Sequence, residues 1–248
     1  VTGTNGKSSI ADFYYQILDL NNKKVASIGT LGIKSKKYKK NLSNTTIDPI
    51  QLSKILNKLK KQNINNVIME ASSHGLSQNR LDGLLFNTGI FTNLSQDHLD
   101  YHKNTKNYLK AKLYLFEKLI KTKGTIITDE KIPEFKKIKN IATNKNLNLF
   151  TLLDKKNNFQ FLSHQYEHES QLPEIKYKNS IHKIKLNLIG KVQFKNVLMA
   201  VIASIKSGIN IEDILITIPK IKSVEGRFER VGRIKNNSKV ILDYAHTP

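Results

Sequence analysis

The segment VTGTNGKSS (1–9) decides the fold that we predict for this chain. Its glycines let backbone N–H groups approach an anion, and a helix that follows directly turns its positive N-terminal end toward the same place. We expect Lys7 to reach the outer phosphates of a nucleotide and Ser8 to bind Mg²⁺. The candidate nucleotide-binding residues of this loop are Gly3, Thr4, Asn5, Gly6, Lys7 and Ser8.

This loop departs from the general phosphate-loop pattern at one position. That pattern has a glycine five residues before Gly6, where this chain has Val1. Gly3 therefore has to allow the close backbone approach, and a glycine turn that only caps a helix is the alternative. Phosphate loops normally follow a buried strand, so we expect residues 1–2 to be the last rung of a strand whose beginning is not shown.

Strand-like and helix-like segments alternate over the first 150 residues. The apolar runs that are typical of strands cover 25–29, 66–71, 88–93, 124–128 and 147–152. Helical patterns cover 7–20, 50–62, 105–121 and 131–138. This alternation predicts an α/β fold, a mostly parallel sheet flanked by helices.

The pattern changes after about residue 150. Short alternating segments at 158–162 and 181–188 predict a small antiparallel β extension that occupies about 150–188. Helical patterns at 191–207 and 211–218 then predict a return to the main fold.

The composition excludes some classes of protein. The 248 residues contain no cysteine, which excludes disulfides and thiolate metal sites. The longest strongly apolar run, 197–205, is too short to span a bilayer. The net charge of +21 suggests nucleic acid as a partner, but the lysines are scattered and lack interleaved aromatic residues. We therefore interpret them as solvated surface, including the basic turn or hairpin KSKKYKKN (34–41).

Arginine is rare in this lysine-rich chain. The planar guanidinium matches carboxylates and phosphates in a way that lysine does not, so positions that keep arginine are candidate anion sites. Arg80 stands alone in one such place, and Arg227 begins the other. We interpret Arg230 and Arg233 as surface residues.

Polar side chains follow two of the predicted strands. Glu70 ends the strand 66–71, and His98 follows the strand 88–93 within SQDHLDYH (95–102). The carboxyl ends of parallel strands form the edge at which α/β sheets bind ligands, and carboxylates suit Mg²⁺. We predict that both residues lie at the edge that holds the phosphate loop, although a structural role is the alternative for His98. Capping and loop hydrogen bonds account equally well for Asp97, Asp100 and His102.

Three stretches carry a resemblance to a known family. They are GTNGKS (3–8), MEASSHGLSQNRLDG (69–83) and FTNLSQDHLDYH (91–102). They resemble the central, ATP-binding domain of the Mur ligases, and within that family the members that add the third peptide residue in peptidoglycan synthesis. The resemblance extends over nearly the whole chain, with little recognisable across about 150–185.

The resemblance implies an ATP-dependent amide ligase that releases ADP and serves cell-wall synthesis. ATP would phosphorylate the free carboxylate of UDP-MurNAc-L-Ala-D-Glu, and the amine of an amino acid would attack the acyl phosphate. meso-Diaminopimelate is the favoured amino acid, with L-lysine as the rival. Two Mg²⁺ ions, Lys7 and helix N-termini would supply the positive charge that phosphoryl transfer needs. We expect a cytoplasmic monomer that binds neither nucleic acid nor a membrane.

The resemblance also assigns a role to Lys112. NYLKAKLYLFEKL (107–119) is similar to the family's Tyr-x-x-Ala-Lys-x-x-Leu-Phe helix, whose lysine is carbamylated. A carbamate would replace a cation with an anion and let Lys112 ligate a second Mg²⁺ beside His98. The reaction requires an uncharged amine, so the site must lower the pKa of Lys112 by burial or by neighbouring positive charge.

Further residues match substrate positions of the family. SNTTID (43–48) suggests Asn44, Thr45 and Thr46 as ligands of the UDP-sugar-peptide, while Thr46 or Asp48 also suits the cap of the helix 50–62. The other matching substrate positions are Ser72, Gln78 and Arg80.

The back end of the chain resembles the family less closely. LIGKVQFKNVLMAVIAS (188–204) keeps Asn196 at the position associated with adenine contact, but Gln193 replaces an asparagine of the family motif. Arg227 matches an arginine near the ATP phosphates or ribose. In VILDYAHTP (240–248), Asp243 and His246 match residues near the nucleotide.

The resemblance divides the chain at residue 240. Residues 1–240 would form the central domain and 241–248 the start of a C-terminal domain, with a UDP-binding domain before residue 1. We expect such a piece to bind nucleotide weakly at most and to complete no turnover. A folylpolyglutamate-synthetase-type ligase is the alternative enzyme, and a basic nucleic-acid-binding module is a distant one.

Overall fold

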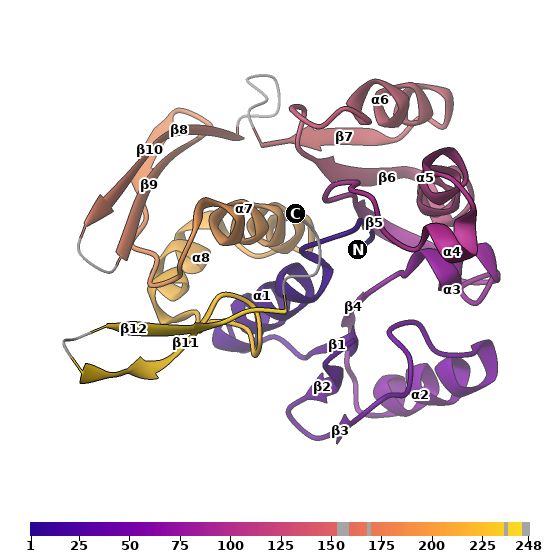
Figure 1. Cartoon of the computed structure of the whole chain (residues 1–248), viewed down its shortest axis with the longest axis horizontal. Helices are drawn as coiled ribbons and strands as arrows, with labels where there is room; N and C mark the ends of the chain where they lie inside the picture. Colours follow the sequence, from indigo (N-terminus) through magenta and orange to yellow (C-terminus); the bar gives the residue numbers. More distant parts are fainter. Residues whose placement is uncertain (153–158, 168–169, 236–237, 245–248) are drawn as a thin grey trace.

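Residues 1–2 lie between two halves of a mostly parallel sheet in the computed structural model of the chain (Figure 1). The nitrogen of Val1 donates to the Met69 carbonyl at 2.8 Å, and the Ala71 N–H donates to the Val1 carbonyl at 2.8 Å. On the other side, Thr2 forms a parallel bridge with Phe91. Residues 1–2 therefore hold the rung position that the sequence predicted.

The two halves contain the strands that the apolar runs predicted. One half has the order β3 (Lys39–Lys40), β2 (Gly32–Ser35), β1 (Val25–Gly29) and β4 (Asn66–Met69). The other has the order β5 (Phe86–Ile90), β6 (Ile120–Thr128) and β7 (Asn148–Thr151). Strands β1 and β4 pair in parallel, as do β5 with β6 and β6 with β7, while β2 and β3 form an antiparallel hairpin. The α/β prediction is confirmed.

The structure describes residues 1–152, 159–167, 170–235 and 238–244. The predicted residue His246 lies outside these ranges. Within them, no helix is both long and apolar enough to cross a membrane.

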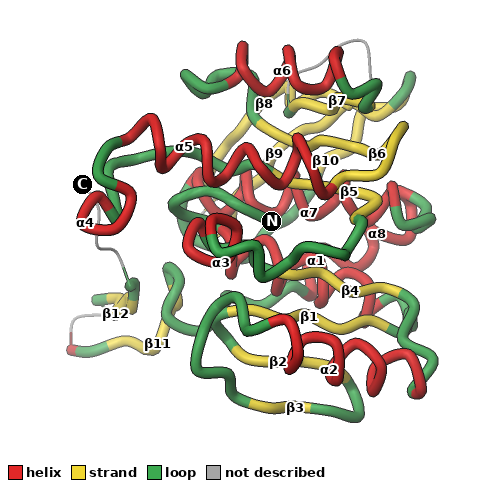
Figure 2. The backbone as a smooth tube through the Cα atoms, turned by 90° about the vertical axis from the view of Figure 1, so that its right-hand side faces the viewer, coloured by secondary structure: helices red, strands yellow, loops and turns green. Residues whose placement is uncertain are grey.

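Helices cover both faces of the sheet (Figure 2). One face carries α1 (Lys7–Leu20), α7 (Lys191–Lys206) and α8 (Ile211–Thr217). The other carries α2 (Pro49–Lys61), α3 (Ser73–Ser77), α5 (Thr105–Tyr114) and α6 (Phe135–Asn144). Neighbouring strand residues serve opposite cores, so Ile90 packs with the first group and Phe91 with the second. Burial on both faces explains why the strands are near-continuous apolar runs.

Two predicted helices have different bounds in the structure. The segment 105–121 divides into α5 and a π-helical turn η1 (Leu115–Leu119), which keeps Leu115 buried and leads directly into β6. The helix predicted at 131–138 begins later, at Phe135. The reason is a turn in which the Asp129 carboxylate accepts the Lys131 N–H at 3.0 Å.

The β extension is antiparallel, as predicted, and contains one strand more than predicted. Its order is β10 (Ser180–Lys183), β9 (Ser170–Tyr177) and β8 (Phe159–Glu167). The strand β9 contains Pro173, a residue that normally argues against a strand interior. The remaining elements are α4 (Leu99–His102), the 3₁₀ turn η3 (Ile218–Lys220), β11 (Glu229–Arg233) and β12 (Lys239–Leu242). The last strand crosses the division at residue 240, which stays a prediction.

Candidate active site at the carboxyl edge of the sheet

The phosphate loop joins the central rung to helix α1, which begins at Lys7. Gly3 and Gly6 have positive φ values of 141° and 87°, a region that side chains strongly disfavour. A Cβ atom on Gly3 would overlap the Thr92 hydroxyl, and one on Gly6 would lie 2.7 Å from Asn196 Oδ1. Both glycines are therefore required by the packing of the loop.

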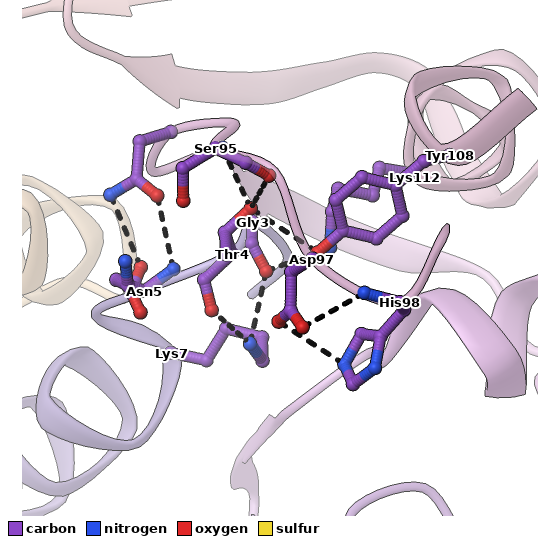
Figure 3. A network of polar contacts seen from close by, with 10 residues as sticks. Gly3, Thr4, Asn5, Lys7, Ser95, Asp97, His98, Tyr108 and Lys112 are labelled. Atoms are coloured by element: carbon purple, nitrogen blue, oxygen red, sulfur yellow. Dashed lines mark hydrogen bonds and ion pairs between the residues drawn. The ribbon is translucent and has the colours of Figure 1, made fainter. Parts of the chain in front are cut away.

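The loop is fixed by the segment that follows β5 (Figure 3). The backbone of Thr4 and Asn5 donates to the Asn93 carbonyl and side chain at 2.9 and 3.0 Å. The Thr92 hydroxyl donates to the Asn5 carbonyl at 2.6 Å, and the Ser95 N–H donates to the Thr4 hydroxyl at 3.0 Å. The predicted loop thus has a defined shape that the segment after β5 determines.

Two lysines converge on the loop (Figure 3). Lys7 Nζ donates to the carbonyls of Gly3 and Thr4 at 3.0 and 2.7 Å, and Lys112 Nζ donates to the Gly3 carbonyl at 2.8 Å. Lys112 is only 1% exposed, and its Nζ lies 4.3 Å from the centre of the Tyr108 ring. Burial, reinforced by the charge of Lys7, lowers the pKa of Lys112 well below its ordinary value, and burial also lowers the pKa of Lys7.

Glu70 emerges at the end of β4 and is 2% exposed. Its carboxylate accepts the Ser8 hydroxyl at 3.0 Å, the Thr30 N–H at 2.8 Å and the Thr30 hydroxyl at 3.2 Å. Gly29 gives it room, because a Cβ atom there would overlap the carboxylate. Our sequence reasoning missed Thr30, although Thr30 follows the strand 25–29 just as Glu70 follows its own.

His98 lies at the same edge in a left-handed backbone conformation, with φ of 52°. Its N–H donates to the Asp97 carboxylate at 2.8 Å, and its Nε2 lies 3.3 Å from the other Asp97 oxygen. The ring of His74 contacts it edge-on, with 4.8 Å between centroids, and the side chain of His98 is 47% exposed. Asp97 therefore orients His98 through a local loop contact.

A cavity of about 220 Å³ opens between these elements. The predicted residues that line it are Thr4, Asn5, Gly6, Lys7, Ser8, Thr45, Glu70, Ser72, His98, Lys112 and Arg227. The other lining residues are Ser9, Thr30, Ser73, Asp97 and Tyr108. The structure thus brings the candidate phosphate, metal and carbamate residues to one place.

Within the described ranges, no three His, Cys, Asp or Glu side chains form a group that could hold a metal. The donor pair that fits Mg²⁺ is the Ser8 hydroxyl and the buried Glu70 carboxylate, 3.0 Å apart. His98 and Lys112 line the same cavity, and in the described part of the chain neither forms a hydrogen bond or ion pair with Ser8 or Glu70.

The remaining predicted substrate residues do not line the cavity. Thr46 is buried, donates to the Glu70 carbonyl at 2.9 Å and accepts the Ser72 N–H at 2.9 Å. Arg80 donates to the Thr46 carbonyl at 2.6 Å, and its contact with an anionic substrate group stays a prediction. Asn44 and Gln78 are exposed, and Gln78 donates to the Tyr101 hydroxyl at 3.2 Å. The cap of α2 is Asp48, which accepts the Gln51 N–H.

Residues from the back of the chain approach the loop through a buried glutamine. Gln193 donates to the Arg227 carbonyl at 3.0 Å and accepts the Asn196 side-chain amide at 3.1 Å. Gln193 departs from the family motif, but its side chain still links Asn196 with Arg227. Asn196 in turn lies beside Gly6 of the loop. Asp243 is half-buried and does not line the cavity.

Comparison with known proteins places the chain in a family. Residues 1–204 match the family model described as the Mur ligase middle domain. Two relatives are named UDP-N-acetylmuramoyl-L-alanyl-D-glutamate--2,6-diaminopimelate ligase. One, from Zymomonas mobilis, is 36% identical over 248 residues, covering 100% of this chain and 51% of the relative. The other, from Rickettsia montanensis, is 36% identical over 253 residues, with 100% and 52% covered. The chain spans about half the length of these relatives.

Solved structures share the fold of this chain. A ligase with the same name superposes with a TM-score of 0.83 at 25% identity, covering 99% of this chain and 50% of that one. A folylpolyglutamate synthetase (FPGS) variant from L. casei has a TM-score of 0.74 at 14% identity, covering 100% and 67%, and at that identity the likeness shows the fold alone. The chain belongs to the Mur ligase family, and its residues 1–204 correspond to the middle domain of that family.

Proposed function

We propose that this chain is the ATP-binding domain of a ligase that joins 2,6-diaminopimelate, as the meso isomer, to UDP-MurNAc-L-Ala-D-Glu. The observation that carries the proposal is the meeting of Lys7, Lys112 and the Ser8–Glu70 pair around one cavity at the phosphate loop. The names of the relatives at 36% identity supply the substrates. Residues 1–240 would form this domain, in a cytoplasmic enzyme that acts as a monomer.

The proposed reaction has two steps. An oxygen of the acceptor carboxylate attacks the γ-phosphorus of ATP, a new O–P bond forms, and the bond to the β-phosphate oxygen breaks to release ADP. The amine of the incoming amino acid then attacks the carbonyl carbon, the C–N bond forms, and inorganic phosphate leaves. A transfer of this kind needs position and positive charge more than covalent help from the protein.

The residues of this chain supply both needs. Backbone N–H groups of the loop and the start of α1 face the phosphates, and Lys7 moves from its carbonyl contacts to the outer phosphate. Arg227 adds a further cation at the wall of the cavity. Ser8 and Glu70 would hold Mg²⁺, which neutralises charge on the phosphate oxygens when bound. The half-exposed His98, on the loop after β5, would act as a ligand of the second Mg²⁺.

Lys112 fits the requirements for carbamylation. The reaction consumes a neutral amine, and the burial of Lys112 favours that form by lowering its pKa. The charge of Lys7 disfavours a second positive charge at this place, and it outweighs the opposite effect of the Asp97 carboxylate. A carbamate on Lys112 would place an anionic group in the cavity wall that suits a second Mg²⁺.

The direct test is isothermal titration of this chain with Mg²⁺-ATP. We expect weak binding that Lys7→Ala abolishes and that Lys37→Ala, on the exposed β2–β3 turn, leaves unchanged. Absence of binding, or binding insensitive to Lys7→Ala, would contradict the proposal. The amino acid is tested in a ligase that carries this domain, by competition of meso-diaminopimelate with L-lysine for UDP-MurNAc-L-Ala-D-Glu, and preference for L-lysine would overturn that part.

A further inference from the structure

We propose that the hydroxyl of Ser73 donates a hydrogen bond to a carboxylate-type oxygen bound in the phosphate-loop cavity. The sequence motif that contains Ser73 predicted other residues as substrate ligands, and Ser73 was not among them. The inference rests on the proposed function, because it assumes that an anion is bound in this cavity.

Ser73 combines burial with an unused donor. It is 2% exposed, and its Oγ has no hydrogen-bond partner among the residues that the structure describes. It lines the same cavity as Glu70, His98 and Lys112. Buried hydroxyls are normally paired, because leaving one unpaired costs free energy. We infer that a bound ligand supplies the hydrogen-bond acceptor that the described residues do not.

The neighbouring serine shows the difference. Ser72 also lines the cavity, but its Oγ accepts the Gly75 N–H at 3.0 Å and so caps α3. Ser72 has a structural task that accounts for its hydroxyl. Ser73 comes one residue later on α3, where the cap needs no second hydroxyl.

The backbone around Ser73 is fixed on two sides. The Ser72 N–H donates to the Thr46 hydroxyl at 2.9 Å, and a Cβ atom on Gly75 would lie 2.6 Å from Thr46. α3 also packs against α5, the helix that carries Lys112. The backbone that carries Ser73 is therefore held in position before a ligand arrives, which lowers the entropy lost on binding.

The surroundings select an anion. The cavity wall includes the cations Lys7 and Arg227 and the buried amine of Lys112, and also the carboxylates of Glu70 and Asp97. A serine hydroxyl placed among cations adds a directed hydrogen bond to the general attraction of the charges. Two carboxylate-type groups fit this chemistry: the reacting carboxylate of the acceptor, and a carbamate formed on Lys112 itself.

Stability provides the first measurement. If the Ser73 hydroxyl stabilised the fold, its removal would lower the stability of the protein. An unpaired buried hydroxyl can be removed with no loss of stability. We expect Ser73→Ala and the similarly sized Ser73→Cys to unfold in urea at the wild-type midpoint or above it. Ser53→Ala, at an exposed position on α2, is the matched control. A clear fall in the midpoint for both Ser73 variants would overturn the proposal.

Ligand binding provides the second measurement, in two arms. One arm titrates UDP-MurNAc-L-Ala-D-Glu into a ligase that carries this domain, with a non-hydrolysable ATP analogue, and the other follows carbamate formation from ¹³C-bicarbonate by NMR. A loss of about tenfold or more in acceptor affinity assigns the hydroxyl to the acceptor, and a similar loss of carbamate occupancy assigns it to Lys112. Both Ser73 variants matching the wild type in both arms would overturn the proposal. If the wild type binds neither nucleotide nor acceptor, the proposed function itself fails.

Discussion

The carbonyl oxygen of Gly3 accepts a hydrogen bond from Lys112 Nζ at 2.8 Å, although the two residues are 109 positions apart. This contact joins the phosphate loop to helix α5. Lys7 donates to the same carbonyl at 3.0 Å, so two lysines meet at one neutral oxygen. Their closeness explains why the pKa of Lys112 falls, since burial and a neighbouring cation both disfavour its charged form.

Lys112→Met should flatten the dependence of stability on pH. Unfolded Lys112 keeps its proton up to its ordinary pKa of 10.5, while the folded form releases it at a lower pH. Between these two pKa values the unfolded state binds more protons, so the free energy of unfolding of the wild type rises with pH. Urea unfolding in CO₂-free buffer from neutral to alkaline pH should show this rise weakened in Lys112→Met. Lys110→Met, exposed on the same helix, should keep it, and equal slopes in all three proteins would refute the lowered pKa.

Gly3→Ala should destabilise the fold far more than the same substitution at a glycine that also has a positive φ but has free space around it. The new Cβ would overlap the Thr92 hydroxyl and would also be forced into a positive φ, so we expect a loss of about 3 kcal/mol or more. Gly208→Ala is the control, because Gly208 has φ of 86° and no atom within 4 Å of an added Cβ. Only the backbone cost of about 1–2 kcal/mol should remain there. Equal losses of stability for the two variants in urea unfolding would contradict the prediction, because they would show that the loop rearranges to accommodate the added Cβ.

Gln193→Ala should weaken nucleotide binding from a position outside the cavity wall. The substitution removes the hydrogen bonds that Gln193 makes with Arg227 and Asn196, and we expect a loss of stability of about 2 kcal/mol. Affinity for Mg²⁺-ATP should fall as well, because Asn196 and Arg227 lose their shared support. Gln51→Ala on the exposed face of α2 should change neither quantity. Full ATP affinity in Gln193→Ala would argue against a link through this side chain.

The basic charge should produce only weak binding to DNA. Because the net charge of +21 is not accompanied by an aromatic platform, we expect association with a random duplex at about 50 mM salt that is lost at about 200 mM. Fluorescence anisotropy at the two concentrations measures this. Lys7→Ala should leave the DNA signal unchanged. Tight binding that persists at the higher salt would instead favour the nucleic-acid-binding alternative.

The parts of the fold that could be predicted are those with one dominant cause. The strands β1 and β6 are apolar because helices cover both of their faces, and this signal is visible in the sequence. The strand β9 was missed because Pro173 interrupts its pattern. The later start of α6 depends on the hydrogen bond between the Asp129 carboxylate and the Lys131 N–H. The helical pattern of the sequence does not indicate this hydrogen bond.

The candidate site was predictable to the extent that its residues follow strand ends or match long motifs. Glu70 and His98 were placed by the first argument and Lys112 by the second, and all three line the cavity. The role of Arg80 at an anionic substrate group stays a prediction, and its hydrogen bond to the Thr46 carbonyl could not be predicted because the sequence does not show that this carbonyl lies within its reach. Ser73 could not be distinguished from Ser72, since only the structure shows which hydroxyl already has a partner.

The position of residues 1–2 has a consequence for the motions of the sheet. At this rung the two half-sheets are joined through the amides of Thr2, Ala71 and Thr92, which pair across residues 1–2. Separation of the halves would expose these amides to solvent, so their hydrogen–deuterium exchange reports how often the sheet opens. A nucleotide that holds the adjoining loop would slow this exchange, and occupancy of the phosphate site would then be detectable in the β-sheet backbone.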